Sequence, residues 1–279
     1  MNPTESLPTR QFEAYPGLPA LRGVNLGNAL DAPWPGVWGV TITETLVQSV
    51  SSAGFNAIRV PVRFSAHTGP APDYILSETI LQSTDQVIQW GLDAGLVVIL
   101  DVHHFDALMQ APAAEEARYL AIWDQLASRY RSLPTALYFE LLNEPHGDLD
   151  GETWNRLIAE SIQHIRQTNP TRTIIIGGLD YSTIDSLNDL VLPDDSHLAA
   201  TFHYYEPFEF THQGASWVSG ATAWTGTTWD GTSAEVSAIE QAFDRAVDWS
   251  NEVFSQQVLF SFFVQRVLFL LIQPCCFVF

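Results

Sequence analysis

The amino-acid sequence predicts an α/β fold, a (β/α)8 barrel, and two observations lead to it. Short apolar runs rich in Val, Ile and Leu, typical of buried parallel strands, alternate with longer amphipathic segments that are typical of helices. This alternation predicts a parallel sheet covered by helices. An open doubly wound sheet usually carries the pattern GxGxxG after its first strand, and the segment 23–29, GVNLGNA, lacks it. We therefore expect the barrel rather than the open sheet.

The recognisable strands are the first six of the barrel. They are expected at residues 21–26, 57–62, 97–102, 136–142, 173–178 and 198–204. Between them, the helix near 152–169 carries its apolar residues on one face, and so does the helix near 233–252. Thr41–Glu44 and Thr232–Glu235 fit the capping-box pattern, in which a hydroxyl and a carboxylate bind free backbone N–H groups at the start of a helix.

Charge and cysteine content limit the possible ligands. The chain of 279 residues has a formal net charge of −20, from 12 basic and 32 acidic residues. Such a surface repels phosphate backbones but not neutral sugars, so no nucleic-acid partner is expected. Cys275 and Cys276 are adjacent, so no disulfide framework is predicted. The N-terminal residues show no basic region followed by an apolar stretch, so no secretory signal is recognised and localisation stays open.

Polar residues gather at the C-terminal ends of the expected strands, where barrels carry their chemistry. They include Asn25, Asn28, Arg59, Arg63, Asp101, His103, His104, Asn143, Glu144, His146, His203, Tyr205 and Glu206. Taken alone, an acidic residue there can simply cap the next helix, and a histidine pair can be structural. A buried Arg59 needs a carboxylate partner. Glu144 is available for this, and an arginine beside it would help to tune its proton affinity.

Six motifs at these positions resemble glycoside hydrolase family 5, the cellulase family of retaining (β/α)8 glycosidases, over residues 20–252. They are RGVNLGN (22–28), IRVPV (58–62), LDVHH (100–104), LNEP (142–145), FHYYEP (202–207) and FTHQGASW (210–217). The resemblance implies that Glu144 is the general acid/base. The substrate-binding residues that it implies are Arg59, His103, Asn143, His203, Tyr205 and Trp217. Trp217 shares a Gly/Thr/Ser-rich loop with Trp224 and Trp229, whose flat rings can stack on sugars or be plain loop hydrophobes.

The chemistry of a retaining glycosidase needs two carboxyl groups roughly 5 Å apart, one protonated beside the leaving oxygen and one ionised beneath the anomeric carbon. The acid must keep its proton near neutral pH, so its pKa has to be raised. A neighbouring nucleophile carboxylate raises that pKa by like-charge repulsion. We therefore expect a raised pKa for Glu144 and a second carboxylate close to it.

The second carboxylate is not found where the family has it. The resemblance places the nucleophile at the end of the seventh strand, in a motif close to Gly-Glu-Phe-Gly, whereas residues 253–279 contain one charged residue, Arg266, and seven phenylalanines. The possible substitutes Glu206, Glu209 and Glu252 do not have the required position. The nucleophile is therefore unknown, and we expect this chain to hydrolyse β-glucan very poorly or not at all.

The residues after 252 form an apolar tail with three possible interpretations. It could be a membrane anchor, for which it is nearly long enough but is interrupted by Gln265, Arg266 and Pro274. It could hold a divergent seventh strand at 257–264, or the sequence could leave its natural frame or be truncated near 253, which we favour. We thus expect an N-terminal extension (1–19), a barrel domain (20–252) with strands seven and eight missing or replaced, and the tail (253–279).

The expected partner is a β-1,4-glucan polysaccharide or oligosaccharide, with mannan, xyloglucan and β-1,3-glucan as alternatives. No cofactor, metal or membrane is expected, and the chain is expected to be a monomer. Two rival functions stay open. One is a metal-dependent hydrolase with His103, His104, His146 and His203 as ligands, although such barrels usually begin with His-x-His on the first strand. The other is a non-catalytic carbohydrate-binding remnant.

Overall fold

The strands form a single curled sheet in the computed structural model, which describes residues 20–253, 261–264 and 277–278. Their order across the sheet is β7-β6-β5-β4-β3-β2-β1-β8. The strands are β1 (Gly23–Asn25), β2 (Ala57–Val62), β3 (Val97–Val102), β4 (Leu137–Glu140), β5 (Ile174–Gly177), β6 (Leu198–Tyr204), β7 (Ser261–Val264) and β8 (Phe277–Val278). Neighbouring strands from β1 to β6 are parallel, which confirms an incomplete (β/α)8 barrel.

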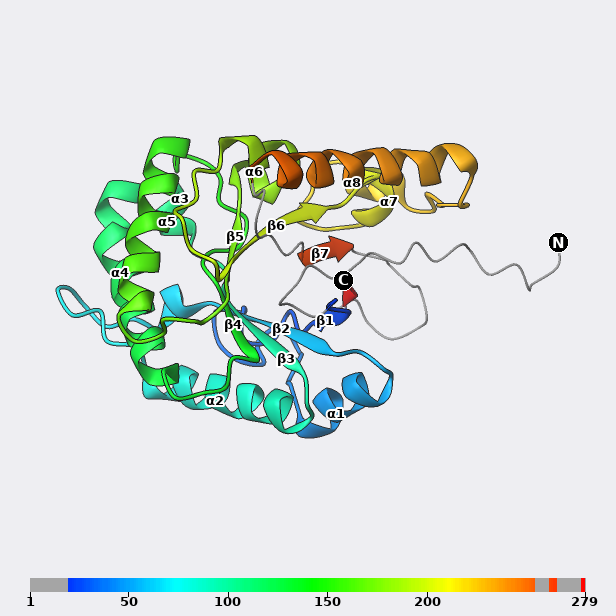
Figure 1. The fold of residues 1–279 in the computed structure, drawn as a ribbon. Helices are drawn as coiled ribbons and strands as arrows, with labels where there is room; N and C mark the ends of the chain where they lie inside the picture. Colours follow the sequence, from blue (N-terminus) through cyan, green and yellow to red (C-terminus); the bar gives the residue numbers. More distant parts are fainter. Residues whose placement is uncertain (1–19, 254–260, 265–276, 279) are drawn as a thin grey trace.

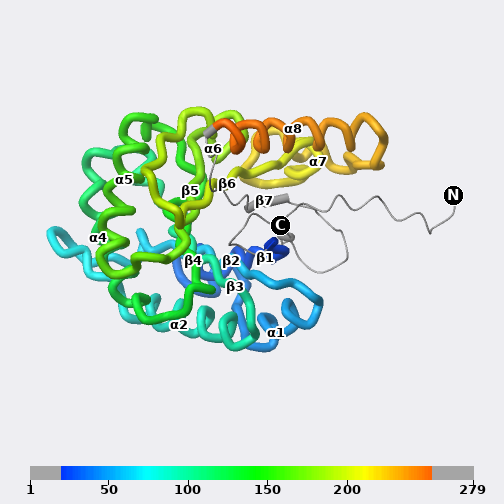
Figure 2. The backbone as a smooth tube through the Cα atoms, viewed as in Figure 1, coloured from blue at the N-terminus to red at the C-terminus, as the bar shows by residue number. Residues whose placement is uncertain are grey.

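The helices follow the strands along the chain and cover the outside of the curled sheet. They are α1 (Glu44–Ser52), η1 (Phe64–His67), α2 (Glu78–Asp93), α3 (Asp106–Gln110), α4 (Pro112–Tyr130), α5 (Gly151–Arg166), α6 (Leu179–Ser182), η2 (Asp185–Asp189), α7 (Phe208–Thr211), η3 (Ala221–Trp224) and α8 (Ser233–Val253). From α1 through α2, α4 and α5 to α8 they form one curved outer layer (Figures 1 and 2).

Local sequence explains where several of these elements begin and end, although the first, fourth and fifth strands are shorter than expected and one helix cap is corrected. The strands expected at 57–62, 97–102 and 198–204 have those bounds in the structure. The capping box at Thr232–Glu235 is confirmed, since the Glu235 carboxylate accepts from the Thr232 N–H at 2.7 Å and the Thr232 hydroxyl accepts from the Glu235 N–H at 3.3 Å. The box expected at Thr41 is wrong. The first helix begins later, and Thr43 caps it by accepting from the Leu46 N–H.

The inside of the barrel is arranged in two layers, because alternate residues of a strand face the same side. The layer nearer the N-terminal ends of the strands is apolar. In it, four residues pack together: Ile99, Tyr138, Ile175 and Ala199. Two residues further along their strands, Asp101 and Glu140 lie in register with each other and are buried. The interior therefore changes from apolar to charged toward the C-terminal ends of the strands.

The tail contributes two strands to the sheet. β7 pairs in parallel with β6 and lies within the segment 257–264 that one interpretation makes a divergent seventh strand. β8 pairs antiparallel with β1, opposite to the direction of a barrel strand, so an eighth parallel strand is not reproduced at this edge of the described sheet. The N-terminal extension, the frame interpretation and most of the tail fall outside the described residues. Among the described residues, no helix has the length and apolar character needed to cross a membrane.

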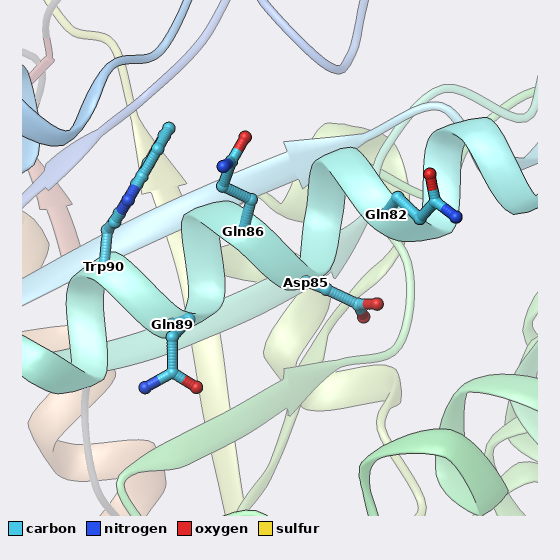
Figure 3. A pocket seen from close by; sticks show the side chains of 5 residues that line it. All are labelled: Gln82, Asp85, Gln86, Gln89 and Trp90. Carbon is cyan, nitrogen blue, oxygen red and sulfur yellow. The ribbon is translucent and has the colours of Figure 1, made fainter.

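Two hollows lie away from the strand ends of β1 to β4. One, of about 430 Å³, is on the outer face of α2 and is lined by Gln82, Asp85, Gln86, Gln89 and Trp90 (Figure 3). The other, of about 540 Å³, lies between the end of β6 and α8, where Tyr204 and Ile239 line it. The first is lined by none of the polar residues singled out at the strand ends, and the second is lined by one of them, Glu206.

Candidate active site at the strand ends

Arg59 is the centre of a buried ion cluster that joins three strands. Its Nε and Nη2 donate to the two carboxylate oxygens of Glu140, each at 2.8 Å, and Nη2 lies 2.8 Å from Oδ2 of Asp101. The side chains of Arg59, Asp101 and Glu140 are 3%, 0% and 1% exposed. A buried charge is tolerated only when it is paired, and two carboxylates fulfil that condition here. We call these three residues the Arg59 cluster.

The composition of this cluster corrects the sequence-based expectation. Glu144 was the available partner for Arg59, whereas the carboxylates seen to pair with it are Asp101 and Glu140. Glu140 was missed altogether, although an acidic residue that ends the apolar run Leu137–Phe139 is a signal that could have found it. Burial raises the pKa of Asp101 to about 6 in spite of the nearby guanidinium of Arg59. Burial likewise raises the pKa of Glu140, again against the effect of Arg59.

Arg59 reaches the strand mouths through two asparagines. Its Nη1 donates to Oδ1 of Asn25 at 3.0 Å, and its Nη2 donates to Oδ1 of Asn143 at 2.9 Å. Because the amide oxygen of Asn143 accepts from the arginine, its NH2 group is left to donate to a ligand. Arg59 itself is nearly inaccessible, so its burial favours a supporting role over direct substrate contact.

Glu144 lies directly after Asn143 and faces two side chains from the end of β6. Its Oε1 is 2.7 Å from Nδ1 of His203 and accepts from the hydroxyl of Tyr205 at 3.1 Å. The carboxylate is 23% exposed. Glu144 has a φ of 48°, in the left-handed region that non-glycine residues rarely adopt. Backbone of this kind is concentrated at active sites and ligand clamps, where the surrounding structure holds it in place.

The electrostatics of Glu144 differ from the expectation of a raised pKa. Burial by itself would raise the pKa of this carboxyl, but the hydrogen bond and charge interaction with His203, together with His103 and the Tyr205 hydroxyl, lower it to about 2. The physical reason is that donors surround the carboxylate.

The histidine pair after β3 is connected to the same cluster. Nδ1 of His103 lies 2.5 Å from Oδ2 of Asp101, and the rings of His103 and His104 meet edge to face at 4.5 Å. Burial, reinforced for His103 by Arg59, lowers the pKa of His103 to about 3. Burial and the neighbouring His103 lower that of His104 to about 4. Both imidazoles are therefore neutral at neutral pH.

Six of the seven predicted site residues thus lie together, linked to one another either by direct contacts or through one intermediate residue. We call Asn143, Glu144, His103, His203 and Tyr205 the cup, with Arg59 beneath it. Trp217 differs, because it is 80% exposed and, within the described part of the chain, takes no part in these hydrogen bonds.

Aromatic residues missed by the sequence reasoning lie on the segment after β1. Trp38 contacts the His104 ring edge to face at 6.1 Å, and Trp34 meets His67 at 5.2 Å. Both tryptophans are exposed. Their position directly after the first strand was the signal that could have found them.

The substitutes for the nucleophile do not join the cup. The carboxylate of Glu206 accepts from the Phe208 N–H at 3.1 Å and so binds the start of α7. Glu209 is exposed within α7, and Glu252 is exposed near the end of α8. The strand β7 has the sequence SFFV, which contains no acidic residue.

The four histidines of the metal-hydrolase alternative do not form one group. Nδ1 of His146 lies 2.6 Å from the backbone oxygen of Glu144, and its ring stacks on Tyr181 at 4.3 Å. His203 is bound to Glu144 instead. Within the described residues, the side chains with metal-ligand spacing are His103, His104 and Asp31, whose ligand atoms lie within 4.8 Å of one another.

Comparison with known proteins agrees with this geometry. The sequence pattern of the Cellulase (glycosyl hydrolase family 5) family matches residues 14–254. Endoglucanase H of Acetivibrio thermocellus is 35% identical over 229 residues, which are 82% of this chain and 24% of that protein. Endoglucanase B of Clostridium cellulovorans is 30% identical over 80% of this chain and 54% of its own length. The chain thus spans about a quarter to a half of these curated relatives.

Solved structures give the same result. Thermotoga maritima Cel5A in complex with mannotriose is 38% identical, with a TM-score of 0.82 over 88% of this chain and 79% of that one. The same enzyme has been solved in complex with cellobiose. The cellulose synthase subunit Z of Clostridioides difficile is 37% identical, with a TM-score of 0.81 over 88% of this chain and 81% of that one.

Proposed function

The chain belongs to glycosyl hydrolase family 5, and from that premise we propose that its cup binds a β-1,4-linked glucan with Glu144 in the place of the general acid/base of a retaining glycosidase. The observation that carries the proposal is the convergence of His203 and Tyr205 on Oε1 of Glu144, at 2.7 and 3.1 Å. A carboxyl held this way at the end of a barrel strand is positioned for proton transfer rather than for helix capping. Endoglucanase relatives support the glucan, and a relative solved with mannotriose makes mannan the next substrate to test.

The roles of the other residues follow from their contacts. Asn143 offers its NH2 group to the sugar 2-hydroxyl, because Arg59 binds its amide oxygen. His103 lines the cup and is oriented by Asp101. Arg59 supports the floor, and Trp217 provides an exposed ring that can stack on a sugar outside the cup.

We further propose that this chain binds glucan but turns it over very slowly. A pKa of about 2 leaves Glu144 ionised near neutral pH, and an ionised carboxylate has no proton to give to the leaving oxygen. A retaining mechanism also needs a carboxylate beneath the anomeric carbon, and the sequence of β7 supplies none. Both observations favour the second candidate function, carbohydrate binding without hydrolysis.

Two measurements on the purified chain test these proposals together. Isothermal titration calorimetry with cellotetraose should show binding, and a reducing-sugar assay on carboxymethylcellulose should show little or no release. Glu144→Gln is the test variant, and Glu240→Gln, an exposed glutamate of α8, is the matched control. Rapid release that Glu144→Gln abolishes and Glu240→Gln preserves would refute slow turnover. Absence of any binding would refute the glucan site.

We also propose a division of the chain into three parts. Residues 20–252 form the hydrolase unit, residues 1–19 are an extension, and residues 253–279 are an apolar tail that contributes β7 and β8 to the sheet. Limited proteolysis followed by mass spectrometry should give a resistant fragment that begins near residue 20. A first cleavage within 20–252 would contradict this division.

A further inference from the structure

Asp31, His103 and His104 meet at the mouths of β1 and β3, beside the cup. Each offers one ligand atom, and the three atoms lie within 4.8 Å of one another. We propose that this group, which we call the Asp31 group, binds one divalent transition-metal ion of the zinc type.

The ligand chemistry fits such an ion. Zinc is bound by imidazole nitrogen and carboxylate oxygen at about 2.0–2.2 Å, usually with tetrahedral geometry. Ligand atoms around one tetrahedral ion are then about 3.4 Å apart, so a separation of 4.8 Å must shorten by at most about 1.4 Å, shared between two side chains. Magnesium and calcium prefer oxygen ligands and stricter or larger shells, so two imidazoles and one carboxylate select against them.

The carboxylate of the group is held in place before any ion arrives. Asp31 is buried, and its Oδ1 and Oδ2 accept from the backbone N–H groups of Ala29 at 2.7 Å and Asn28 at 3.0 Å. Each carboxylate oxygen has two acceptor sites, so these bonds fix the group and still leave lone pairs for a cation.

The imidazole of His103 is held in the same manner. Nδ1 of His103 faces Oδ2 of Asp101, which leaves Nε2 as the nitrogen for a ligand. Metal-binding histidines almost always contact a carboxylate, carbonyl or water through the other ring nitrogen, which fixes the orientation of the ring and makes it a better ligand. His104 packs edge to face on His103 and on Trp38, so its ring is also supported.

The surrounding charge also favours a cation. Two guanidinium groups lie nearby, and both are paired: Arg59 with Asp101 and Glu140, and Arg63 with Asp106. With Asp31 added, four carboxylates stand against two guanidinium groups in this part of the barrel. A divalent ion would therefore enter a negative environment.

Metal binding by this group would affect the cup, because His103 belongs to both. An ion on Nε2 of His103 would withhold that nitrogen from a sugar, so metal and glucan should compete. The competition rests on the proposed function, whereas the metal site itself does not.

Calorimetric titration of ZnCl2 into the metal-stripped full chain at pH 7 tests the site directly. We expect saturable binding of one ion, and no heat from MgCl2. His104→Ala and Asp31→Asn should each weaken binding at least tenfold, and Asp101→Asn by about 10–100-fold, as for other outer-shell carboxylates. His164→Ala is the matched control, since His164 lies 2.7 Å from the Asp124 carboxylate on the surface, and it should bind as the parent does.

Two further measurements separate binding at the Asp31 group from binding at the thiols and from loss of folding. The titrations are repeated with Cys275→Ser and Cys276→Ser, so that zinc held by the thiols is recognised, and circular dichroism establishes that each variant is folded. No saturable binding in the cysteine-free chain, or equal affinity in folded Asp31→Asn and parent, would overturn the site. Zinc binding that leaves the affinity for cellotetraose unchanged would overturn the competition, and failure of cellotetraose to bind at all would count against the glucan proposal alone.

Discussion

Replacing Arg59 by methionine should cost about 3–5 kcal/mol of the free energy of unfolding at pH 7, the range found when one partner of a buried ion pair is removed. The substitution keeps a long side chain but leaves Asp101 and Glu140, 0% and 1% exposed, without the cation between them. An exposed ion pair is worth at most about 1 kcal/mol. The size of the loss therefore depends on burial rather than on the number of bonds broken.

The pH dependence of this loss has a definite sign. Burial raises the folded-state pKa of Asp101 to about 6, above its ordinary value of 3.8, and raises that of Glu140 in the same direction. A group with a raised pKa stabilises the fold most below its unfolded pKa, and that contribution is lost as pH rises through the folded pKa. Without Arg59 both pKa values should rise further. The deficit of Arg59→Met should therefore shrink as the pH falls from 7 toward 5.

Urea unfolding followed by tryptophan fluorescence, at pH 7 and pH 5, measures both quantities. The matched control is Arg156→Met, because Arg156 is half-exposed and also contacts two carboxylates, those of Glu116 and Glu160. That control should lose no more than about 1 kcal/mol. Equal losses in the two variants, or an Arg59→Met deficit that does not change between pH 7 and pH 5, would refute the reasoning.

Three other predictions concern the cup. Position 263 is in register with His203, and neighbouring positions of a strand lie on opposite faces. Phe263→Glu should therefore raise carboxymethylcellulose hydrolysis on the order of 100-fold above Val264→Glu, and equal rates would contradict this register. Tyr205→Phe should raise the pKa of Glu144. The Tyr205→Phe variant should also have a free energy of unfolding about 1–2 kcal/mol lower than the parent above pH 4.5. In acid unfolding, this difference between parent and variant should fade toward pH 2. A difference that stays constant with pH would contradict the prediction. When an aryl β-cellobioside is the substrate and azide is added, azide should form a bond to C1 as the aryl oxide leaves. Chromatography should then detect α-cellobiosyl azide. Release of cellobiose alone would indicate that the chain supplies a nucleophile of its own.

The fold was largely predictable because the strands are continuous apolar runs. Residues 57–62 and 97–102 show that signal clearly, and the structure keeps their bounds. The first strand is shorter than expected, Gly23–Asn25 instead of 21–26, because it has few apolar residues to define its ends. The cap of α1 was misplaced by two residues because two threonines, Thr41 and Thr43, precede that helix and either could cap it.

The proximity of most of the named side chains could be predicted from the sequence, but their electrostatics could not. Residues at strand ends converge in any barrel, so proximity of the named side chains followed from topology. Which carboxylate would pair with Arg59 depended on the register of β3 and β4, which a single sequence does not reveal. The direction of the Glu144 pKa depended on donors that lie 59 and 61 residues further along the chain, at His203 and Tyr205.

The buried floor beneath the cup has a consequence for the kind of molecule that binds there best. Two carboxylates and one guanidinium leave a residual negative potential in a region without solvent to screen it. Glycosidic cleavage proceeds through an oxocarbenium-like, positively charged sugar ring, and negative potential favours that species over the neutral ground state. Positively charged ring analogues should accordingly bind more tightly than uncharged sugars of equal size, even in a protein that completes no cleavage.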